Sequence, residues 1–421
     1  MKTLKINGGW PLVGEIPISG MKNAALPILF ATIVTEDVCI IDNIPPVGDI
    51  EVALQILAAM GAHVVRHSPT VVEIDTREVR QGCSPDALVR RLRGSNYLIG
   101  AELSRYGRAK VGSAGGCNFG ALPIDQHIKG FTSFGSQVEQ TPDFVTAVVP
   151  SGTLRGAHIV LDTVSVGATA NLLLASCTAD GVTVIDNAAH EPHIVDLANF
   201  LNACGADITG AGTSTIRVQG VNKLHGCRYT IIPDMIEAGT YMVAAAATGG
   251  HITLRRVIPQ HLEAVSDALR AMGVSVEQTA DSVTVRSDQP LRGVHVQAVP
   301  YPGFPTDMQP QMTALLAVVE GVSHVTDHVF KGRFRYVEEL CRMGAVIDVD
   351  EASATATVTG KCELHGAQVC ATDLRAGAAL VIAGLVAQGQ TVIAESQLIE
   401  RGYVDIVGKL TSLGADIQII S

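Results

Sequence analysis

The sequence predicts a mixed α/β fold, in which β-sheets pack around buried helices in two globular halves of three similar units each. Three observations predict it: a glycine pattern that recurs six times, helical segments that are apolar on every side, and an aliphatic composition. The chain has 421 residues, of which 47% are hydrophobic, only 4% are aromatic and 42 are glycine. This length suits two to four domains, and the composition excludes a disordered, coiled-coil or collagen-like chain.

The repeat rests on three markers that keep one period. A glycine that ends a helical segment and precedes a strand recurs at intervals of 68 to 74 residues, at positions 61, 135, 205, 273, 344 and 414. The pattern Leu-x-Gly accompanies it, with glycines at 14, 156, 226, 293 and 366, and only the second unit lacks a clean copy, near Gly82. A third glycine ends each apolar helix, at 107, 181, 250, 321 and 389, with Asp37 in its place in the first unit.

Each unit reads as strand, apolar helix, strand, loop, second helix, glycine and strand. The apolar helices, such as residues 168–175, have hydrophobic residues on nearly every side and must be buried. The second helices, such as residues 51–60, are amphipathic and are expected to form an outer layer. Units of about 70 residues are longer than the repeats of common solenoids, so the pattern favours globular halves.

Charge and composition exclude some classes of function. The formal net charge of −11 disfavours a nucleic-acid-binding protein, which normally carries a basic surface. The first residues do not read as a secretory signal, and the longest apolar stretches, such as residues 376–387, are far shorter than the roughly 20 residues of a membrane span. The sequence therefore predicts a cytoplasmic protein that binds neither nucleic acid nor membrane.

The nine cysteines are odd in number and contain no CxxC pair. This pattern favours reduced thiols over a disulfide framework or a structural zinc site. Cys117 differs from the rest because it lies in a glycine-flanked loop, Gly115-Gly116-Cys117-Asn118-Phe119-Gly120, where we expect it to be accessible, unlike the other eight. Near cationic groups such a thiol can act as an acid or a nucleophile, although a surface thiol without a role remains the alternative.

The starts of the apolar helices carry, or lie next to, residues suited to binding charge. They are Lys22, Arg93, Gly167, Ile236 (between Asp234 and Glu237), Asp307 and Arg375. Helix N-termini present unpaired N–H groups and bind anions readily. The repetition predicts that these starts converge on a cleft between the two halves, built for a multiply charged anion. The alternative is a set of exposed caps.

Several candidates keep a plain alternative. Lys22 is either a phosphate or carboxylate ligand or a solvated lysine, and Asp307 is either a general base or an N-cap. Arg333 and Arg401 occupy equivalent loops, as anion ligands or as salt-bridged surface residues. His190-Glu191-Pro192-His193 has the spacing of a metal pair, but no third ligand is evident. Phosphate-binding, dinucleotide-binding and nucleophile-elbow motifs are absent from the sequence.

Several segments together resemble the UDP-N-acetylglucosamine 1-carboxyvinyltransferase family. They are Ser19-Gly20-Met21-Lys22-Asn23-Ala24-Ala25-Leu26-Pro27, Gly115-Gly116-Cys117, Pro123-Ile124-Asp125-Gln126-His127, Ser165-Val166-Gly167-Ala168-Thr169, Phe304-Pro305-Thr306-Asp307-Met308-Gln309, Ala371-Thr372-Asp373-Leu374-Arg375-Ala376 and Arg401-Gly402-Tyr403. The resemblance runs over essentially the full length. The related 5-enolpyruvylshikimate-3-phosphate synthases lack the cysteine loop.

The resemblance implies a fold and a domain division. The fold is an inside-out α/β prism, with two domains of three βαβαββ repeats each, joined by a double crossover. One catalytic domain is discontinuous and comprises residues 1–21 and 232–421. The other comprises residues 22–231 and carries the Cys117 loop.

The resemblance also implies the reaction and its main groups. The enolpyruvyl group of phosphoenolpyruvate is transferred to the 3′-hydroxyl of UDP-N-acetylglucosamine, and phosphate is released, without a metal or other cofactor. This is the first committed step of peptidoglycan synthesis, and so of cell wall biogenesis, cell shape and division, and it is the target of fosfomycin. Cys117 would protonate C3 and could form a covalent adduct. Asp307 would take the hydroxyl proton, and Lys22, Arg401 and Arg375 would hold phosphate and carboxylate.

The substrate-binding residues that the resemblance implies are Asn23, Arg93, Leu122, Pro123, Ile124, Asp125, Gln126, Ser165, Val166, Gly167, Val329, Arg333 and Arg375. Three positions depart from the family pattern: Leu122 and Met235 replace arginines, and Gly48 replaces a lysine. Each change removes positive charge, and a lost charged hydrogen bond costs roughly 1.5–3 kcal/mol. These departures leave two alternatives, an enolpyruvyl transferase for a different nucleotide acceptor and a catalytically weak paralogue that binds nucleotide sugar.

Overall fold

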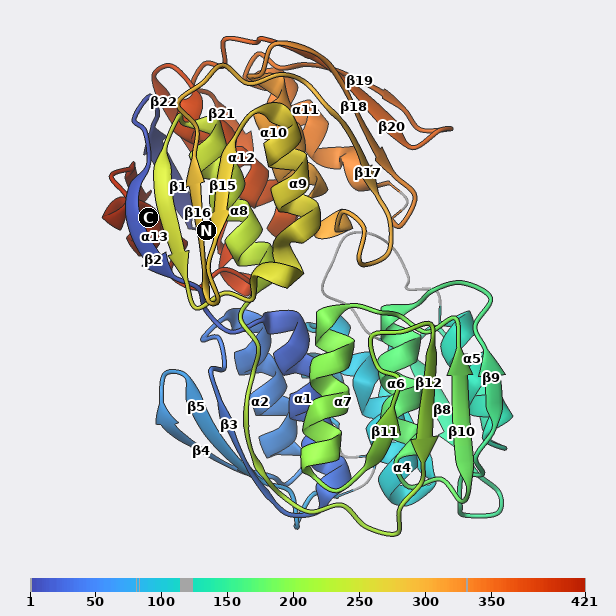
Figure 1. The fold of residues 1–421 in the computed structure, drawn as a ribbon. Coiled ribbons are helices and arrows are strands. Elements are labelled where there is room, and N and C mark those ends of the chain that lie inside the picture. The colour runs from blue at the N-terminus through green and yellow to red at the C-terminus, as the bar shows by residue number, and fades with distance from the viewer. Residues whose placement is uncertain (1, 81, 83, 114–123, 331, 421) are drawn as a thin grey trace. The chain divides into compact units, whose positions relative to one another are not determined.

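The computed structural model describes residues 2–80, 82, 84–113, 124–330 and 332–420. The chain divides into two compact units, one made of Gly20–Ile232 and the other of Met1–Ser19 together with Pro233–Ser421 (Figure 1). We call them the continuous and the discontinuous unit. The domain boundaries predicted from the sequence lie within two residues of this division.

The continuous unit contains eleven strands, seven α-helices and one short 3₁₀ helix among its described residues. Its helices are α1 (Lys22–Thr35), α2 (Gly48–Ala59), α3 (Asp86–Val89), α4 (Tyr97–Tyr106), α5 (Asp125–Ser133), α6 (Val166–Ser176) and α7 (Pro192–Ala203), with η1 (Arg93–Asn96) before α4. Its strands are β3 (Val38–Asp42), β4 (His63–Ser68), β5 (Val71–Asp75), β6 (Arg108–Gly112), β7 (Gln137–Gln140), β8 (Phe144–Val148), β9 (His158–Val160), β10 (Val182–Asp186), β11 (Asp207–Thr209), β12 (Thr215–Gln219) and β13 (Arg228–Thr230).

The discontinuous unit repeats the same alternation. Its helices are α8 (Met235–Ala247), α9 (Glu263–Met272), α10 (Gln309–Ala317), α11 (Val337–Arg342), α12 (Leu374–Val386) and α13 (Ile406–Ser412), with short η2 (Pro259–Leu262), η3 (Thr306–Met308), η4 (Arg333–Tyr336) and η5 (Ser396–Arg401). Its strands are β1 (Thr3–Asn7), β2 (Val13–Pro17), β14 (His251–Arg255), β15 (Ser275–Gln278), β16 (Ser282–Arg286), β17 (His295–Ala298), β18 (Gly321–Asp327), β19 (Val346–Asp350), β20 (Thr355–Gly360), β21 (Gln368–Cys370), β22 (Gln390–Ala394) and β23 (Asp416–Ile420).

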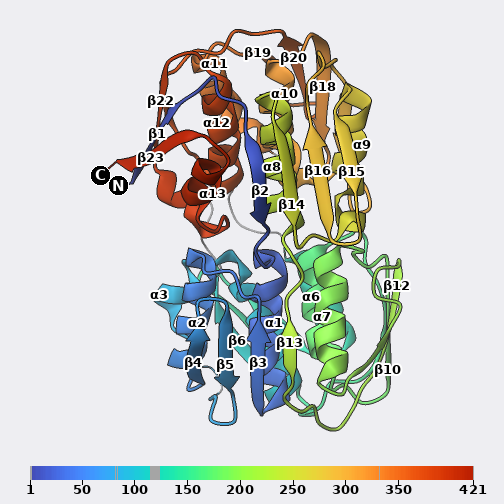
Figure 2. The ribbon, with the colours of Figure 1, turned by 60° about the vertical axis from the view of Figure 1, so that its left-hand side comes forward.

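The sheets repeat one topology. Among the described residues, five sheets have four strands, in the orders β9-β10-β12-β11, β13-β3-β5-β4, β2-β14-β16-β15, β17-β18-β20-β19 and β21-β22-β1-β23. In each, the first pair is parallel and the following pairs are antiparallel. The remaining sheet, β6-β8-β7, has three strands and belongs to the unit without a clean Leu-x-Gly pattern. Figure 2 shows β2 beside β14, and β13 beside β3.

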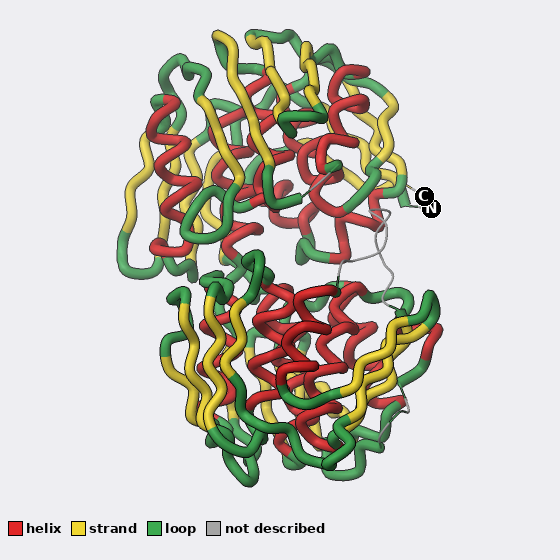
Figure 3. Tube along the Cα trace, turned by 90° about the vertical axis from the view of Figure 1, so that its right-hand side faces the viewer, coloured by secondary structure: helices red, strands yellow, loops and turns green. Residues whose placement is uncertain are grey.

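Helices fill the inside of each unit, and strands surround them (Figure 3). In α6, for example, every residue from Ala168 to Ser176 is buried. The predicted class, an inside-out α/β prism with two sets of three repeats, is confirmed. The all-round apolar helices explain it, because such a helix is stable only when it is covered on every side.

The repeat glycines have conformational roles. The six helix-ending glycines, at 61, 135, 205, 273, 344 and 414, have φ between 88° and 107°, where a side chain would be strained. Most Leu-x-Gly glycines instead allow close backbone approach, since a Cβ on Gly226 would lie 1.8 Å from the carbonyl oxygen of Val38, whereas Gly14 has a positive φ of 131°. The residue that ends the apolar helix differs by one position from the sequence prediction in two units. The residues with positive φ there are Glu36 and Gly249, not Asp37 and Gly250.

Glu102 on α4 is a buried acid whose titration should affect stability. Burial raises the pKa of Glu102 to about 7, from an ordinary value of 4.5. Hydrogen bonds from the backbone N–H groups of Lys110 and Gly82 act in the opposite direction but are weaker. Between pH 4.5 and 7 the unfolded chain releases the proton that the folded chain keeps, so the unfolding free energy falls as pH rises, by about 3 kcal/mol in total.

We therefore expect Glu102→Gln to weaken the loss of stability between pH 4.5 and 7.5, as measured by urea denaturation at several pH values. The exposed Glu139, in the same unit, provides the control Glu139→Gln, which should keep the wild-type pH dependence. If Glu102→Gln and wild type lose stability in parallel, Glu102 is not protonated in the folded protein.

Candidate active site

In the discontinuous unit, one carboxylate is held between two buried arginines. Arg333 Nη2 donates to Asp307 Oδ1 at 3.0 Å, and Arg375 Nη2 donates to Asp307 Oδ2 at 2.8 Å. Both arginines are 5% exposed, whereas the Asp307 side chain is 27% exposed. The surface alternative for Arg333 is therefore wrong. Asp307 is not the N-cap residue of either helix, since Pro305 takes that position in η3 and Met308 takes it in α10.

Helix packing brings these three residues together. Asp307 lies in η3, immediately before α10, while Arg375 is the second residue of α12, whose N-cap is Asp373. Near the start of α8, Gly239 faces Met308, because a Cβ there would meet the Met308 side chain at 3.0 Å. The three buried helices of this unit thus begin side by side, as the sequence predicts for one half.

Donors remain unused around Asp307. Nε of Arg333 and Nη1 of Arg375 are buried and form no hydrogen bond with the described residues. Burial acts to lower the pKa of Arg375, but the Asp307 carboxylate and other nearby negative groups raise it above its ordinary value overall. Both guanidinium groups are permanently charged, and each keeps one nitrogen whose N–H has no partner among the described residues.

Aromatic rings and a hydrogen-bond network position the two arginines. Arg333 Cζ lies 5.2 Å from the ring centre of Phe330, and Arg375 Cζ lies 5.6 Å from that of Tyr403. The buried Tyr403 hydroxyl is 2.9 Å from Thr240 Oγ1 and accepts from Gln311 Nε2 at 3.1 Å. Tyr403 belongs to the motif Arg401-Gly402-Tyr403, but nothing in the sequence near it indicates its contacts with α8 and α10.

Two further candidates lie in loops of this unit. Val329 is 44% exposed, and its N–H donates to Asp327 Oδ1 at 2.9 Å, which fixes the turn after β18. Arg401 is half-buried at the end of η5. Met235, one of the departures from the family pattern, is the first residue of α8 and is buried.

In the continuous unit, Lys22 is buried at the first position of α1. Its Nζ lies 3.1 Å from Asp49 Oδ2, and the two side chains are only 11% and 9% exposed. The alternative of a solvated lysine is therefore wrong. Asp49 is the second residue of α2 and follows Gly48, another departure from the family pattern. Asn23, next to Lys22, is half-buried.

The starts of α5 and α6 bring the other predicted binding residues together. Gln126 Nε2 donates to Asp162 Oδ2 at 3.2 Å, and the N–H of Asp162 donates to Gln126 Oε1 at 2.8 Å. Asp162 leads to Ser165, which caps α6 by accepting from the N–H of Ala168. A Cβ on Gly167 would lie 3.1 Å from Nε2 of the buried His127. Asp125 is the first residue of α5, Ile124 is its N-cap residue, and Val166 is the first residue of α6.

Arg93, in η1, lies near the first turns of α1, because a Cβ on its neighbour Gly94 would lie 3.1 Å from Cδ1 of Leu26. The N–H of Gly100 donates to Asn171 Oδ1 at 2.9 Å, which connects α4 to the middle of α6. Cys117, Leu122 and Pro123 lie outside the described residues. The convergence of both sets of helix starts on one cleft stays a prediction.

The prediction that Cys117 alone is accessible is wrong for one residue, since Cys341 is exposed. Within the described residues, no group of three or more His, Cys, Asp or Glu side chains could hold a metal ion. No helix in that part of the chain is both long and apolar enough to cross a membrane.

Comparisons of sequence and of fold relate the chain to known proteins. A sequence model of the family described as EPSP synthase (3-phosphoshikimate 1-carboxyvinyltransferase) matches residues 6–410. The chain is 49% identical to UDP-N-acetylglucosamine 1-carboxyvinyltransferase 3 of Caldanaerobacter subterraneus subsp. tengcongensis and 49% identical to the UDP-N-acetylglucosamine 1-carboxyvinyltransferase of Clostridium botulinum, over 99% of each chain. The crystal structure of the enolpyruvyl transferase NikO from Streptomyces tendae is similar with a TM-score of 0.88 and 28% identity, over 100% of this chain and 99% of that one.

Proposed function

Because this chain belongs to the UDP-N-acetylglucosamine 1-carboxyvinyltransferase family of enolpyruvyl transferases, we propose that it transfers the enolpyruvyl group of phosphoenolpyruvate to the 3′-hydroxyl of UDP-N-acetylglucosamine. Phosphate is released, and the product enters peptidoglycan synthesis. The observation that carries the proposal is the full-length identity to relatives with this activity in their names. The same proposal places the enzyme in the cytoplasm.

The reaction proceeds by addition and elimination. The acceptor oxygen loses its proton and forms a bond with C2 of phosphoenolpyruvate, while C3 gains a proton and becomes a methyl group. The tetrahedral intermediate then loses a proton from C3, and the bond between C2 and the phosphate oxygen breaks. Cys117 supplies the proton to C3 and can form a phospholactoyl adduct with C2.

Asp307 accepts the proton of the acceptor hydroxyl. Its carboxylate accepts from Arg333 on one oxygen and from Arg375 on the other, which fixes the orientation of the group. Its partial exposure leaves room for a substrate hydroxyl. A base held in this way is already oriented when the acceptor arrives.

Cations hold the phosphate and carboxylate of phosphoenolpyruvate. Arg375 offers a buried, unused N–H to an anion, and Lys22 and Arg401 complete the set. These groups stabilise charge as phosphate leaves, an effect that removal of a single donor typically reduces by a factor of about 10²–10³. The acceptor is bound by the residues Asn23, Arg93, Leu122, Pro123, Ile124, Asp125, Gln126, Ser165, Val166, Gly167, Val329 and Arg333.

The test is a phosphate-release assay with pure, folded protein. We expect inorganic phosphate to appear from phosphoenolpyruvate only after UDP-N-acetylglucosamine is added, with one enolpyruvyl ether formed per phosphate. Phosphoenolpyruvate alone, and phosphoenolpyruvate with shikimate 3-phosphate, serve as controls. Absence of acceptor-dependent release would contradict the proposal.

The departures Leu122, Met235 and Gly48 favour a second candidate, because all three remove positive charge from a site for anions. In this alternative the chain is an enolpyruvyl transferase for another nucleotide, or a weak paralogue that binds the nucleotide sugar. A panel of nucleotide acceptors in the same assay separates a changed acceptor from the main proposal. Calorimetric binding of UDP-N-acetylglucosamine without turnover would indicate the weak paralogue.

A further inference from the structure

Three cysteines of the continuous unit gather near the C-terminal end of α1, the opposite end of that helix from Lys22. Cys204 follows the end of α7, Cys227 immediately precedes β13, and Cys39 lies in β3. The Sγ atoms of Cys204 and Cys227 are 3.4 Å apart. Cys39 interacts with both thiols, and Thr35 Oγ1 lies 3.7 Å from its Sγ.

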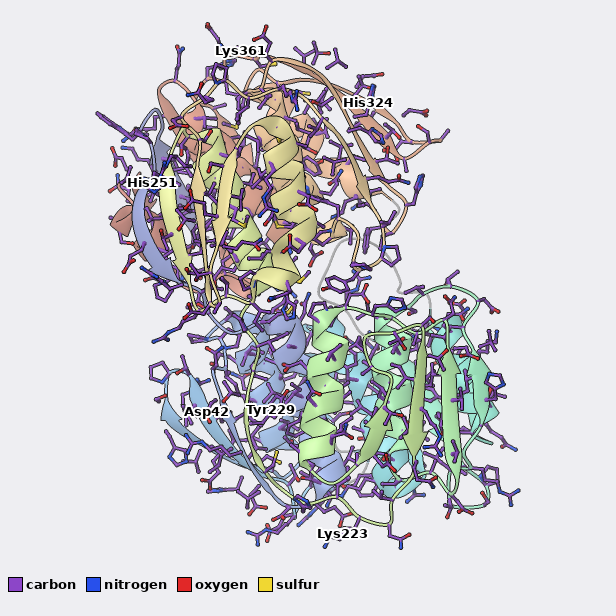
Figure 4. All side chains as sticks on the ribbon, viewed as in Figure 1. Asp42, Lys223, Tyr229, His251, His324 and Lys361 are labelled. Carbon is purple, nitrogen blue, oxygen red and sulfur yellow. The ribbon has the colours of Figure 1, made fainter. Side chains whose placement is uncertain are left out.

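Backbone pairing holds this cluster in place. β13 runs parallel to β3, with Arg228 opposite Ile40, and the N–H of Ile40 donates to the carbonyl oxygen of Cys227 at 2.9 Å. The N–H of His225 donates to the carbonyl oxygen of Cys204 at 2.9 Å, which ties the loop before β13 to the end of α7. Figure 4 labels Asp42 and Tyr229, which lie on these two paired strands.

We propose that Cys204 and Cys227 form a reversible disulfide bond when hydrogen peroxide is present, so that this cluster is an oxidative modification site. A disulfide requires the sulfur atoms to approach from 3.4 Å to about 2.05 Å, a shift that side-chain rotation and small backbone adjustments can supply. The proposal does not depend on the proposed enzymatic activity.

The burial of the thiols decides the order of steps. Cys204 and Cys39 have no exposed surface, whereas Cys227 is half-buried, so peroxide meets Cys227 first. The Cys227 sulfur attacks one peroxide oxygen, the O–O bond breaks, and the products are a sulfenic acid and one water. The Cys204 sulfur then attacks the Cys227 sulfur, the S–O bond breaks, and the disulfide and a second water form. Two thiols are oxidised and one peroxide is reduced.

Cys39 lies beside both thiols but does not enter the bond. Hydrogen bonds from the thiols of Cys204 and Cys227 lower the pKa of Cys39, and burial opposes them. The hydrogen bond with Cys204 acts to lower the pKa of Cys227, but the interaction with Cys39 and burial raise it overall.

The bond would connect the end of α7 to the start of β13, across 23 residues of chain. Because a cross-link restricts the unfolded chain, we expect oxidation to raise the unfolding temperature of the continuous unit by about 5–10 °C. The variant Cys204→Ser cannot form the bond and should show no such rise.

The experiment uses the full-length, reduced protein. The protein is treated with hydrogen peroxide, its remaining thiols are alkylated under denaturing conditions, and it is digested without reductant for mass spectrometry. We expect a linked pair of peptides containing Cys204 and Cys227, with two hydrogens fewer than the separate peptides, which dithiothreitol separates again. Cys204→Ser and Cys227→Ser should each abolish it.

Two variants decide whether the pairing is correct. Cys39→Ser and Cys341→Ser should both keep the linked peptides, the second because Cys341 is an exposed thiol outside the cluster. In Cys204→Ser, dimedone should trap a sulfenic acid on Cys227. The proposal is overturned if no linked peptide forms, if the link disappears in Cys39→Ser, or if Cys227 is oxidised to the sulfinic acid while Cys204 is alkylated.

Discussion

Replacing Asp307 by asparagine is expected to reduce kcat for phosphate release by a factor of about 10²–10⁴, the usual contribution of a general base. The amide keeps the size of the side chain but cannot accept the acceptor's proton. It also leaves the buried Arg333 and Arg375 facing a neutral group. Breaking a buried ion pair costs about 3–5 kcal/mol, and we expect the lower end because Asp307 is 27% exposed.

Two measurements separate these effects. Acceptor-dependent phosphate release gives kcat, and urea denaturation gives stability, both at a temperature where the variant is fully folded. Asp348 is exposed in the same unit, so Asp348→Asn is a matched control that should change neither quantity. A folded Asp307→Asn protein with wild-type kcat would remove Asp307 from the mechanism.

Replacing Lys22 by methionine is expected to have the other large effect. The change removes a cation from the proposed phosphate site, for which we expect a loss of about 10²–10³ in kcat/KM. It also takes away the ammonium partner of Asp49, whose side chain is only 9% exposed. Stability should therefore fall by about 3–5 kcal/mol.

The double variant Lys22→Met/Asp49→Leu distinguishes a structural from a functional lysine. With both charges removed, stability should return close to that of the wild type, because replacing a buried ion pair by apolar residues is often neutral. Turnover should stay low. Lys2→Met breaks an exposed ion pair with Glu400 and serves as the control. Recovery of activity along with stability in the double variant would show that Lys22 is needed only for folding.

Much of the fold was predictable because it depends on interactions between residues that are close in the sequence. A glycine with positive φ at a helix end depends on a few neighbouring residues, so the six glycines and their spacing indicate the repeats directly. Residues 168–176 read as a buried helix because their composition alone requires cover on all sides. The missing Leu-x-Gly pattern near Gly82 likewise marks the one repeat whose described sheet has three strands.

The site was predictable in its residue types but not in its contacts. Asp307 reads equally well as a helix cap, because capping is a local interaction that any aspartate before a helix can make. Its actual partner Arg375 is 68 residues away along the chain. Lys22 reads as solvated for the same reason, since Asp49 lies 27 residues further on.

The repeating units, the buried helices and the chemical groups at the helix starts follow from the amino-acid sequence, because they depend on composition and on neighbours within a few residues. Which carboxylate meets which guanidinium, and which thiols come into contact, follows only from the packing of helices and strands that are distant in sequence. Asp307 lies between two arginines, and Cys204 touches Cys227, because the folded units bring separate repeats and their loops together.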